Sequence, residues 1–292
     1  MFCHTQRGLK HGHVDPASNP HDPRLANVSR NRHIFPAGFG TPDLPNNGLA
    51  TEFTLPQIEG MLIRQHSLED HVEHIYVKSA EYCKGHDGPQ HEFILVTVET
   101  NEDPRFRNYI ILDRTYSLPA HQLVINTALS SSATPAKDRL RISYDGTLKP
   151  LLEHCSVSKY RVLETLEFQK MSFLLYELIV LSRAASDDRY RTHYALISQS
   201  YWYASLIWDC MRQLLPATSL VHTIHTKKNV RGKFGKVFHP RTGTDSRVLS
   251  TISEDVDQEL DILRRKFADV QKNWTNQETP LYEQQQENAQ LE

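Results

Sequence analysis

The sequence predicts an α+β fold, in which a mainly antiparallel sheet of four or five strands packs against two helices, with a long C-terminal helix added. Three observations support this prediction. Short β-branched and apolar runs occupy the first half of the chain, two apolar helical faces follow them, and an amphipathic pattern fills the region before the tail. With 292 residues, of which 39% are hydrophobic, the chain is long enough to bury one sizeable core.

The N-terminal region is rich in Pro, Asn, His and Gly and shows neither helical nor strand periodicity. Residues 1–50 are therefore predicted to form a disordered arm. A short amphipathic helix is expected over residues 54–66, because apolar residues recur there at helical spacing and Pro56 fits the first turn. The predicted α+β domain spans residues 51–216.

Four segments of this domain have the composition and the period of β-strands. The linker 101–107 between the second and the third is short enough for antiparallel pairing. Residues 82–90, with two glycines and a proline, are expected to form a turn, and residues 127–137 a surface loop. Residues 160–168 fit a strand or a helix equally well. The four predicted strands are 74–80, 91–99, 108–114 and 138–144.

Two helices are expected to cover the sheet. Residues 171–181 place apolar side chains on one broad face. The second helix, residues 200–215, follows the apolar run 194–197. Ser198 is predicted to cap it, and Ser200 would then lie in its first turn, where free backbone N–H groups and the helix dipole favour an anion or a charged nucleophile. The apolar stripe of this helix repeats every four residues and consists of Trp202, Leu206, Cys210 and Leu214.

The last part of the chain contains a basic segment, an amphipathic helix and a polar tail. Residues 217–246 are predicted to form a basic loop, because Lys and Arg accumulate there and no acidic residue occurs over 212–243. Residues 247–274 are predicted to be helical, because apolar residues recur at spacings of three and four. Their stripe must cover either the body of the protein or a partner. Residues 275–292, rich in Gln, Glu and Asn, are predicted to be disordered.

The composition argues against several classes of protein. A formal net charge of -2 gives no global attraction to nucleic acid or anionic membranes. The apolar runs are too short to cross a bilayer and the first residues do not lead into a signal-peptide core, so a cytoplasmic or nuclear protein is expected. The cysteines lie far apart without a CxxC pair, which argues against a zinc ribbon, a redox dithiol and a compact disulfide framework. These cysteines are Cys3, Cys83, Cys155 and Cys210. No cofactor and no metal are predicted.

The residue types of a nucleophilic site occur at the ends of predicted elements. His91 opens the second strand, Asp113 lies near the end of the third, and Ser200 begins a helix. A hydroxyl attacks a carbonyl only when a base accepts its proton, and the base works better when a third group fixes its tautomer. Antiparallel strands would bring His91 and Asp113 together, and the helix would bring up Ser200. Alternatively, His91 is a solvent-exposed strand end, Asp113 pairs with Arg114 or another base, and Ser200 only caps its helix.

The order of these residues resembles that of the circularly permuted papain-like families. In the lecithin retinol acyltransferase-like and PPPDE peptidase-like groups, a His opens a strand and the nucleophilic Cys follows at a helix start, in a motif of the form Asn-Cys-aromatic-x-Phe. The matching stretch here is Ser198–Ala204, SQSYWYA, and the matching histidine is His91. The chain also resembles a group of fungal proteins that carry a His-Glu strand followed by a Cys-Tyr-Trp-aromatic helix.

This resemblance implies a papain-like-fold hydrolase or acyltransferase. Ser200 would be the nucleophile, His91 the base, Asp113 the orienting group, and first-turn N–H groups the oxyanion donors. The sequence departs from the pattern, because Ser200 stands where the families have Cys and Gln199 where they have Asn. A serine hydroxyl is far less acidic than a thiol, so a degenerate relative without activity is also consistent with the residues. Cys210 is expected to be a small buried hydrophobic residue of the same helix.

A function of a different class is the alternative. A non-catalytic protein-interaction module would use the C-terminal helix, Val248–Trp274, and the basic loop to dock a partner or a second copy. The run Lys227–Arg241 would otherwise hold phosphate or nucleic acid with its cations. No Walker or Rossmann glycine pattern accompanies it. A solvated basic loop that balances the acidic terminal helix is the simpler interpretation.

Overall fold

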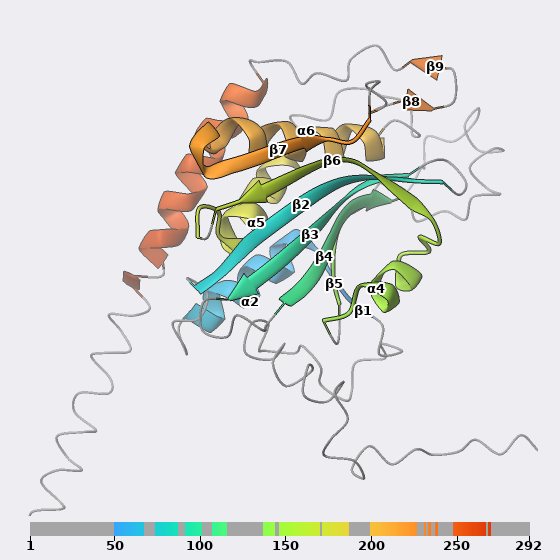
Figure 1. Ribbon diagram of the computed structural model, residues 1–292. Helices are drawn as coiled ribbons and strands as arrows, with labels where there is room; N and C mark the ends of the chain where they lie inside the picture. The colour runs from blue at the N-terminus through green and yellow to red at the C-terminus, as the bar shows by residue number, and fades with distance from the viewer. Residues whose placement is uncertain are drawn as a thin grey trace, which may run out of the picture.

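The computed structural model describes an α+β protein, as the sequence predicts (Figure 1). The predicted arm before residue 50, the predicted tail 275–292 and residues 127–136 of the predicted loop lie outside the described residues. The described residues are 50–66, 74–86, 91–100, 107–115, 137–143, 146–169, 171–186, 199–226, 231, 233–234, 237–238, 248–266 and 268–269.

A seven-stranded sheet forms the centre of the fold, in the order β1-β5-β4-β3-β2-β6-β7 (Figure 1). Every neighbouring pair is antiparallel, which confirms the predicted sheet type. The strands are β1 (Ala50–Phe53), β2 (Ile75–Gly85), β3 (Glu92–Thr100), β4 (Arg107–Thr115), β5 (Lys137–Ser143), β6 (Tyr160–Phe168) and β7 (Leu220–Ile224).

The sheet has more strands than the four or five expected. The predicted strands correspond to β2, β3, β4 and β5, and β2 also includes residues 82–85, which the sequence predicts to be part of a turn. The outer strands β1 and β7 have only four and five residues, too few to show a clear period of two. The ambiguous segment 160–168 is strand β6.

Parts of the predicted basic loop form regular elements. A short 3-10 turn, η4 (Ala217–Ser219), leads into β7, which pairs with β6 as an edge of the sheet. Residues 217–224 therefore belong to the α+β domain and not to a loop, which corrects the predicted boundary. Farther along, β8 (Lys233–Phe234) pairs with β9 (Val237–Phe238) in a two-stranded hairpin.

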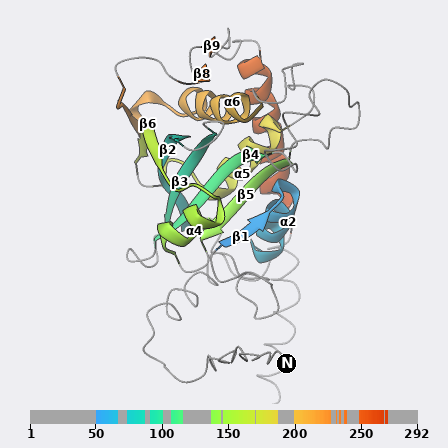
Figure 2. The ribbon, with the colours of Figure 1, turned by 90° about the vertical axis from the view of Figure 1, so that its right-hand side faces the viewer.

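One face of the sheet is covered by four helices, which enclose the larger of two apolar cores. In Figure 2, α2, α5 and the C-terminal helix are seen on the side of the sheet away from α4, and α6 crosses above them. The helices are α2 (Leu55–His66), α5 (Leu175–Ala185), α6 (Gln199–Leu214) and the C-terminal helix, residues 248–266. All four lie close to their predicted positions, since long amphipathic segments carry the clearest periodic signal.

The C-terminal helix packs on the body of the protein. Five side chains from its apolar stripe are buried in the large core: Leu249, Ile252, Val256, Leu260 and Leu263. Arg264 on this helix also forms an ion pair with Glu177 of α5, at 3.7 Å. Of the two alternatives that the sequence left open for this stripe, the structure therefore supports the body over a partner.

The opposite face carries a smaller apolar cluster, and α4 (Leu148–His154) covers part of it. The sequence did not predict this helix, which is only seven residues long and contains Pro150 in its first turn. Gly146 introduces it with φ at +74°, and a Cβ at this position would lie 3.0 Å from the Arg107 carbonyl oxygen. No helix in the described part of the chain is long and apolar enough to cross a membrane.

Candidate functional site

His91 and Asp113 meet on the α4 face of the sheet. The distance from His91 Nε2 to Asp113 Oδ2 is 3.0 Å. Asp113 is 3% exposed and His91 25% exposed, so the imidazole edge reaches solvent while the carboxylate does not. A carboxylate only accepts hydrogen bonds, so Nε2 carries the proton and donates it, which leaves Nδ1 as the second ring nitrogen. The predicted contact between base and orienting group is present.

Two arginines of β5 hold the same carboxylate. Arg141 Nη2 donates to both Asp113 oxygens, at 3.2 and 3.0 Å, and Arg139 Nε lies 3.8 Å from Oδ1. Arg141 Nε and Arg139 Nη1 also donate to Glu52 of β1, at 3.1 and 3.2 Å. The strand register explains this network, because Asp113 stands opposite Arg139 and Glu52 stands opposite Arg141.

The surroundings keep Asp113 ionised. Burial alone raises the pKa of this carboxyl, but the hydrogen bond from His91 and the charges of Arg141 and Arg139 outweigh burial and hold the pKa below its ordinary value. The His91 ring stacks on Phe93, with centroids 6.1 Å apart, so the imidazole is fixed from two sides. The arrangement orients a histidine and stabilises a buried charge.

The side chain of Cys155 interacts with this network. This residue forms the C-cap of α4 and hydrogen-bonds to Arg141. Burial raises the pKa of the thiol to about 11, although the positive charge of Arg141 opposes this effect. The thiol is therefore protonated at neutral pH, and a nucleophilic cysteine requires the opposite shift. Among the described residues, the hydrogen-bonding partner of the His91 ring is Asp113 and not Cys155.

The helix that carries Ser200 packs on the other face of the sheet. Side chains alternate along a strand, so Ile110 and Leu112 of β4 face α6 and the large core, whereas Ile111 and Asp113 face α4. Most of the buried residues of α6, among them Tyr203, Leu206 and Trp208, belong to the large core. The sheet therefore lies between the His91 ring and the body of α6. The side chain of Ser200, its predicted cap Ser198 and the run 194–197 lie outside what the structure describes.

The first turns of α6 contact a different set of polar residues. The Tyr201 ring lies under the ammonium group of Lys84, at 5.1 Å from Nζ to the centroid. Lys84 is 2% exposed and pairs with the fully buried Glu92, at 2.9 Å, and Glu92 also accepts a hydrogen bond from the Tyr82 hydroxyl. Sequence reasoning missed this buried pair. The sequence did contain a signal for it. Side chains alternate along β3, so Glu92 and its neighbour His91 point to opposite faces of the sheet.

A second buried network lies farther along α6. Trp208 is fully buried, packs edge-on against Tyr82 and donates from Nε1 to Glu164 Oε2 at 3.0 Å. Arg231, from the basic segment, lies 3.0 Å from both Glu164 and Asp209 and is only 8% exposed. The sequence left two alternatives for Arg231, a solvated basic loop or a loop that holds phosphate or nucleic acid. In the structure its guanidinium neutralises carboxylates of the body, so this residue anchors the segment.

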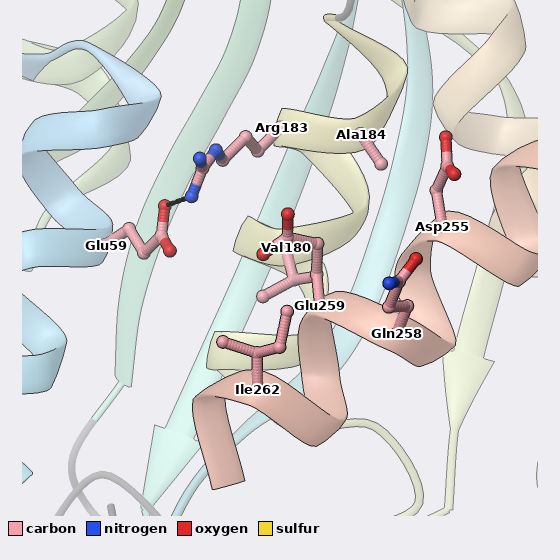
Figure 3. Close-up of a pocket in the computed structure, with 8 residues that line it drawn as sticks. All are labelled: Glu59, Val180, Arg183, Ala184, Asp255, Gln258, Glu259 and Ile262. Carbon is pink, nitrogen blue, oxygen red and sulfur yellow. Dashed lines mark hydrogen bonds and ion pairs between the residues drawn. The ribbon is translucent and has the colours of Figure 1, made fainter. Parts of the chain in front are cut away.

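A groove of about 310 Å³ opens where α2, α5 and the C-terminal helix meet (Figure 3). It was not predicted, because its walls come from three helices that are distant in sequence. Figure 3 shows side chains from all three helices around it. Its polar and charged side chains are Glu59, Arg183, Asp255, Gln258 and Glu259, and its apolar ones are Val180, Ala184 and Ile262.

Two other expectations concern thiols and metals. Cys210 is 2% exposed in the large core, which confirms its predicted role as a small buried hydrophobic residue. Burial, and then the charge of Asp209, raises the pKa of its thiol to about 12. In the described ranges, no group of three or more His, Cys, Asp or Glu side chains is arranged to hold a metal ion.

Comparisons with known proteins add no relative. No protein-family model matches the chain, and the searches of curated proteins and of solved structures found no match. The resemblance to the permuted papain-like families stays a prediction from the residues quoted above.

Proposed function

We propose that this chain is a non-catalytic protein-interaction module that docks a cationic segment of a partner in the groove beside the C-terminal helix. The groove itself is the observation that carries the proposal. Its lining combines three carboxylates with three apolar side chains, and it is built from helices whose apolar residues are buried in the large core.

The lining of the groove favours Lys and Arg side chains. Three carboxylates, of Glu59, Asp255 and Glu259, face one guanidinium, that of Arg183, so the formal charge of the lining is -2 (three negative and one positive). Arg183 is already paired with Glu59. The long aliphatic stem of Lys or Arg can lie along the apolar side chains of the lining while its charged head reaches the carboxylates. A basic and partly apolar peptide therefore matches both parts of the surface.

The groove is also pre-formed. The C-terminal helix contributes its charged side while its apolar stripe is buried, as Ile252 and Leu260 show with 0% and 8% exposure. Binding would therefore not require this helix to fold or to leave the core, which reduces the ordering cost of association. For the same reason, deletion of the helix would damage the fold, and point substitutions are the appropriate test.

Binding of a fluorescently labelled amphipathic Leu/Lys peptide, followed by anisotropy at low salt, tests this proposal. The double substitution Asp255→Asn and Glu259→Gln removes two groove charges while nearly preserving side-chain shape. We expect about tenfold weaker binding, corresponding to about 1.4 kcal/mol, and further weakening as salt increases.

The matched control is Glu254→Gln with Asp257→Asn. These residues lie on the same helix, are exposed, and do not line the groove. The control makes the same change in net charge, and we expect its affinity to stay within about twofold of the wild type. Equal losses in both double variants would show that the peptide senses only the overall charge, and would refute docking in the groove.

Acyl transfer is the second candidate, and the His91–Asp113 contact is the observation that favours it. The placement of α6 on the other face of the sheet speaks against it, because a base must come within hydrogen-bond reach of the proton it accepts. Treatment with fluorophosphonate and iodoacetamide probes, followed by mass spectrometry, separates the two candidates. We expect no rapid labelling. Labelling of Ser200 that is lost in His91→Ala would support acyl transfer instead.

A further inference from the structure

We infer that the partner segment for the groove is the basic stretch 227–241 of a second copy of this chain, so that copies associate head to tail. This inference rests on the proposed function and names the occupant of the same groove. Its support comes from charge, from the way the basic stretch is anchored, and from where the hairpin and the groove lie on the molecule.

The two surfaces are complementary in charge. Residues 227–241 contain six Lys and Arg residues and no Asp or Glu. Residues 251–261 of the C-terminal helix contain five Asp and Glu residues and no Lys or Arg. Two of those five, Asp255 and Glu259, line the groove. The basic stretch also contains Phe234, Val237 and Phe238 among its cations, a composition that suits a groove with both acidic and apolar lining residues.

The basic stretch is anchored away from its own groove. Arg231 ties it to Glu164 of β6 and Asp209 of α6, and the β8–β9 hairpin follows directly. Figure 1 and Figure 2 both show this hairpin above α6 and apart from α2 and α5, which line the groove with the C-terminal helix. The hairpin therefore lies away from the groove of its own copy, which leaves that groove to the basic stretch of a neighbouring copy.

Such a contact joins two different surfaces. Each copy would use its hairpin toward one neighbour and its groove toward another, which is a heterologous contact. Heterologous contacts generate rings when the rotation closes and open chains when it does not. Association should then depend on protein concentration and decrease with salt, because exposed charges are screened within about 8 Å at physiological ionic strength.

Sedimentation velocity of the full chain at low and high salt tests the inference. The groove variant carries Asp255→Asn and Glu259→Gln, and the hairpin variant carries Lys233→Gln and Lys236→Gln. We expect the wild type to form species larger than a monomer at low salt, and each variant alone to sediment as a monomer. In an equimolar mixture, the intact hairpin of one variant meets the intact groove of the other. We therefore expect the mixture to stop at a one-to-one dimer.

Three results would overturn the inference. A wild type that stays monomeric at every concentration, while the Leu/Lys peptide still binds the groove, refutes self-association and leaves the proposed function standing. A mixture of variants that stays monomeric excludes the complementary contact. Salt-sensitive binding of single-stranded RNA that the hairpin variant loses, without self-association of the wild type, would instead assign the basic stretch to nucleic acid.

Discussion

The two faces of the central sheet are built from alternating residues of the same strands, yet they differ in chemistry. The face under α6 belongs to a large apolar core in which Trp208, Tyr203 and Leu206 are fully buried. The face under α4 carries a small apolar cluster beside the ionic network of Asp113, Arg141 and Glu52. The large-core face combines extensive apolar burial with buried ion pairs such as Lys84–Glu92, whereas the α4 face has only a small apolar cluster beside its carboxylate–arginine network.

This difference determines which side chains can come close enough to react with one another. The sheet separates a nucleophile on α6 from a base on the α4 face, even where the helix and the strands are neighbours in the fold. The residue types of a catalytic triad are present, but alternation along β3 and β4 directs two of them to one face while α6 packs on the other. On the large-core side, a charged groove opens at the C-terminal helix.

The largest effect is expected on the α6 face, from Trp208→Ala. The substitution removes a fully buried ring and also leaves Glu164 without the Nε1 donor. We expect a loss of about 3–5 kcal/mol in the free energy of unfolding, measured by denaturant titration. Gln213→Ala on the same helix is exposed and should stay within about 0.5 kcal/mol of the wild type. Similar losses for the two variants would contradict the assignment of α6 to the core.

A somewhat smaller effect is expected on the α4 face, from Asp113→Ala. This change leaves the buried Arg141 with the partly exposed Glu52 as its remaining carboxylate partner among the described residues. We expect a loss of about 3 kcal/mol, because a buried charge without its partner is strongly destabilising. Asp257→Ala, an exposed aspartate of the C-terminal helix, is the comparison and should have little effect. If both substitutions cost the same, the network does not stabilise this face.

The same carboxyl predicts a pH dependence. The pKa of Asp113 is lower in the folded protein than its ordinary value of about 3.9. Its contribution to stability is therefore complete above that ordinary value and is lost as pH falls through the lower, folded-state pKa. Between pH 5 and pH 2 the wild type should lose more stability than Asp113→Asn, which cannot titrate at this position. Parallel curves for the two proteins would contradict the lowered pKa.

Sequence reasoning recovered the parts of the fold that have a clear period. The long amphipathic helices and the central strands β3 and β4 were predicted within a few residues, and the approach of His91 to Asp113 followed from antiparallel pairing. The short elements β1, β7 and α4 were not predicted, because each has too few residues for periodicity to stand out. Their positions depend on pairing and packing with distant parts of the chain.

The candidate site was harder to predict because a sheet has two faces. The sequence indicates which residues of a strand share a face, but not against which face a later helix packs. The packing of α6 on the face opposite His91 could therefore not be predicted for the helix that carries Ser200. The ion pairs of Arg231 could not be predicted either, because its carboxylate partners Glu164 and Asp209 are distant in sequence. The groove depends on three helices that meet only in the folded protein, so no local pattern could reveal it.

A double-mutant cycle on the free energy of unfolding tests the separation of the two faces most directly. One cycle pairs His91→Ala with Asp113→Ala, and the other pairs His91→Ala with Ser200→Ala. The structure predicts a coupling of about 0.5–3 kcal/mol in the first cycle and additivity within about 0.5 kcal/mol in the second. Strong coupling of His91 to Ser200, with none to Asp113, would contradict this division of the molecule.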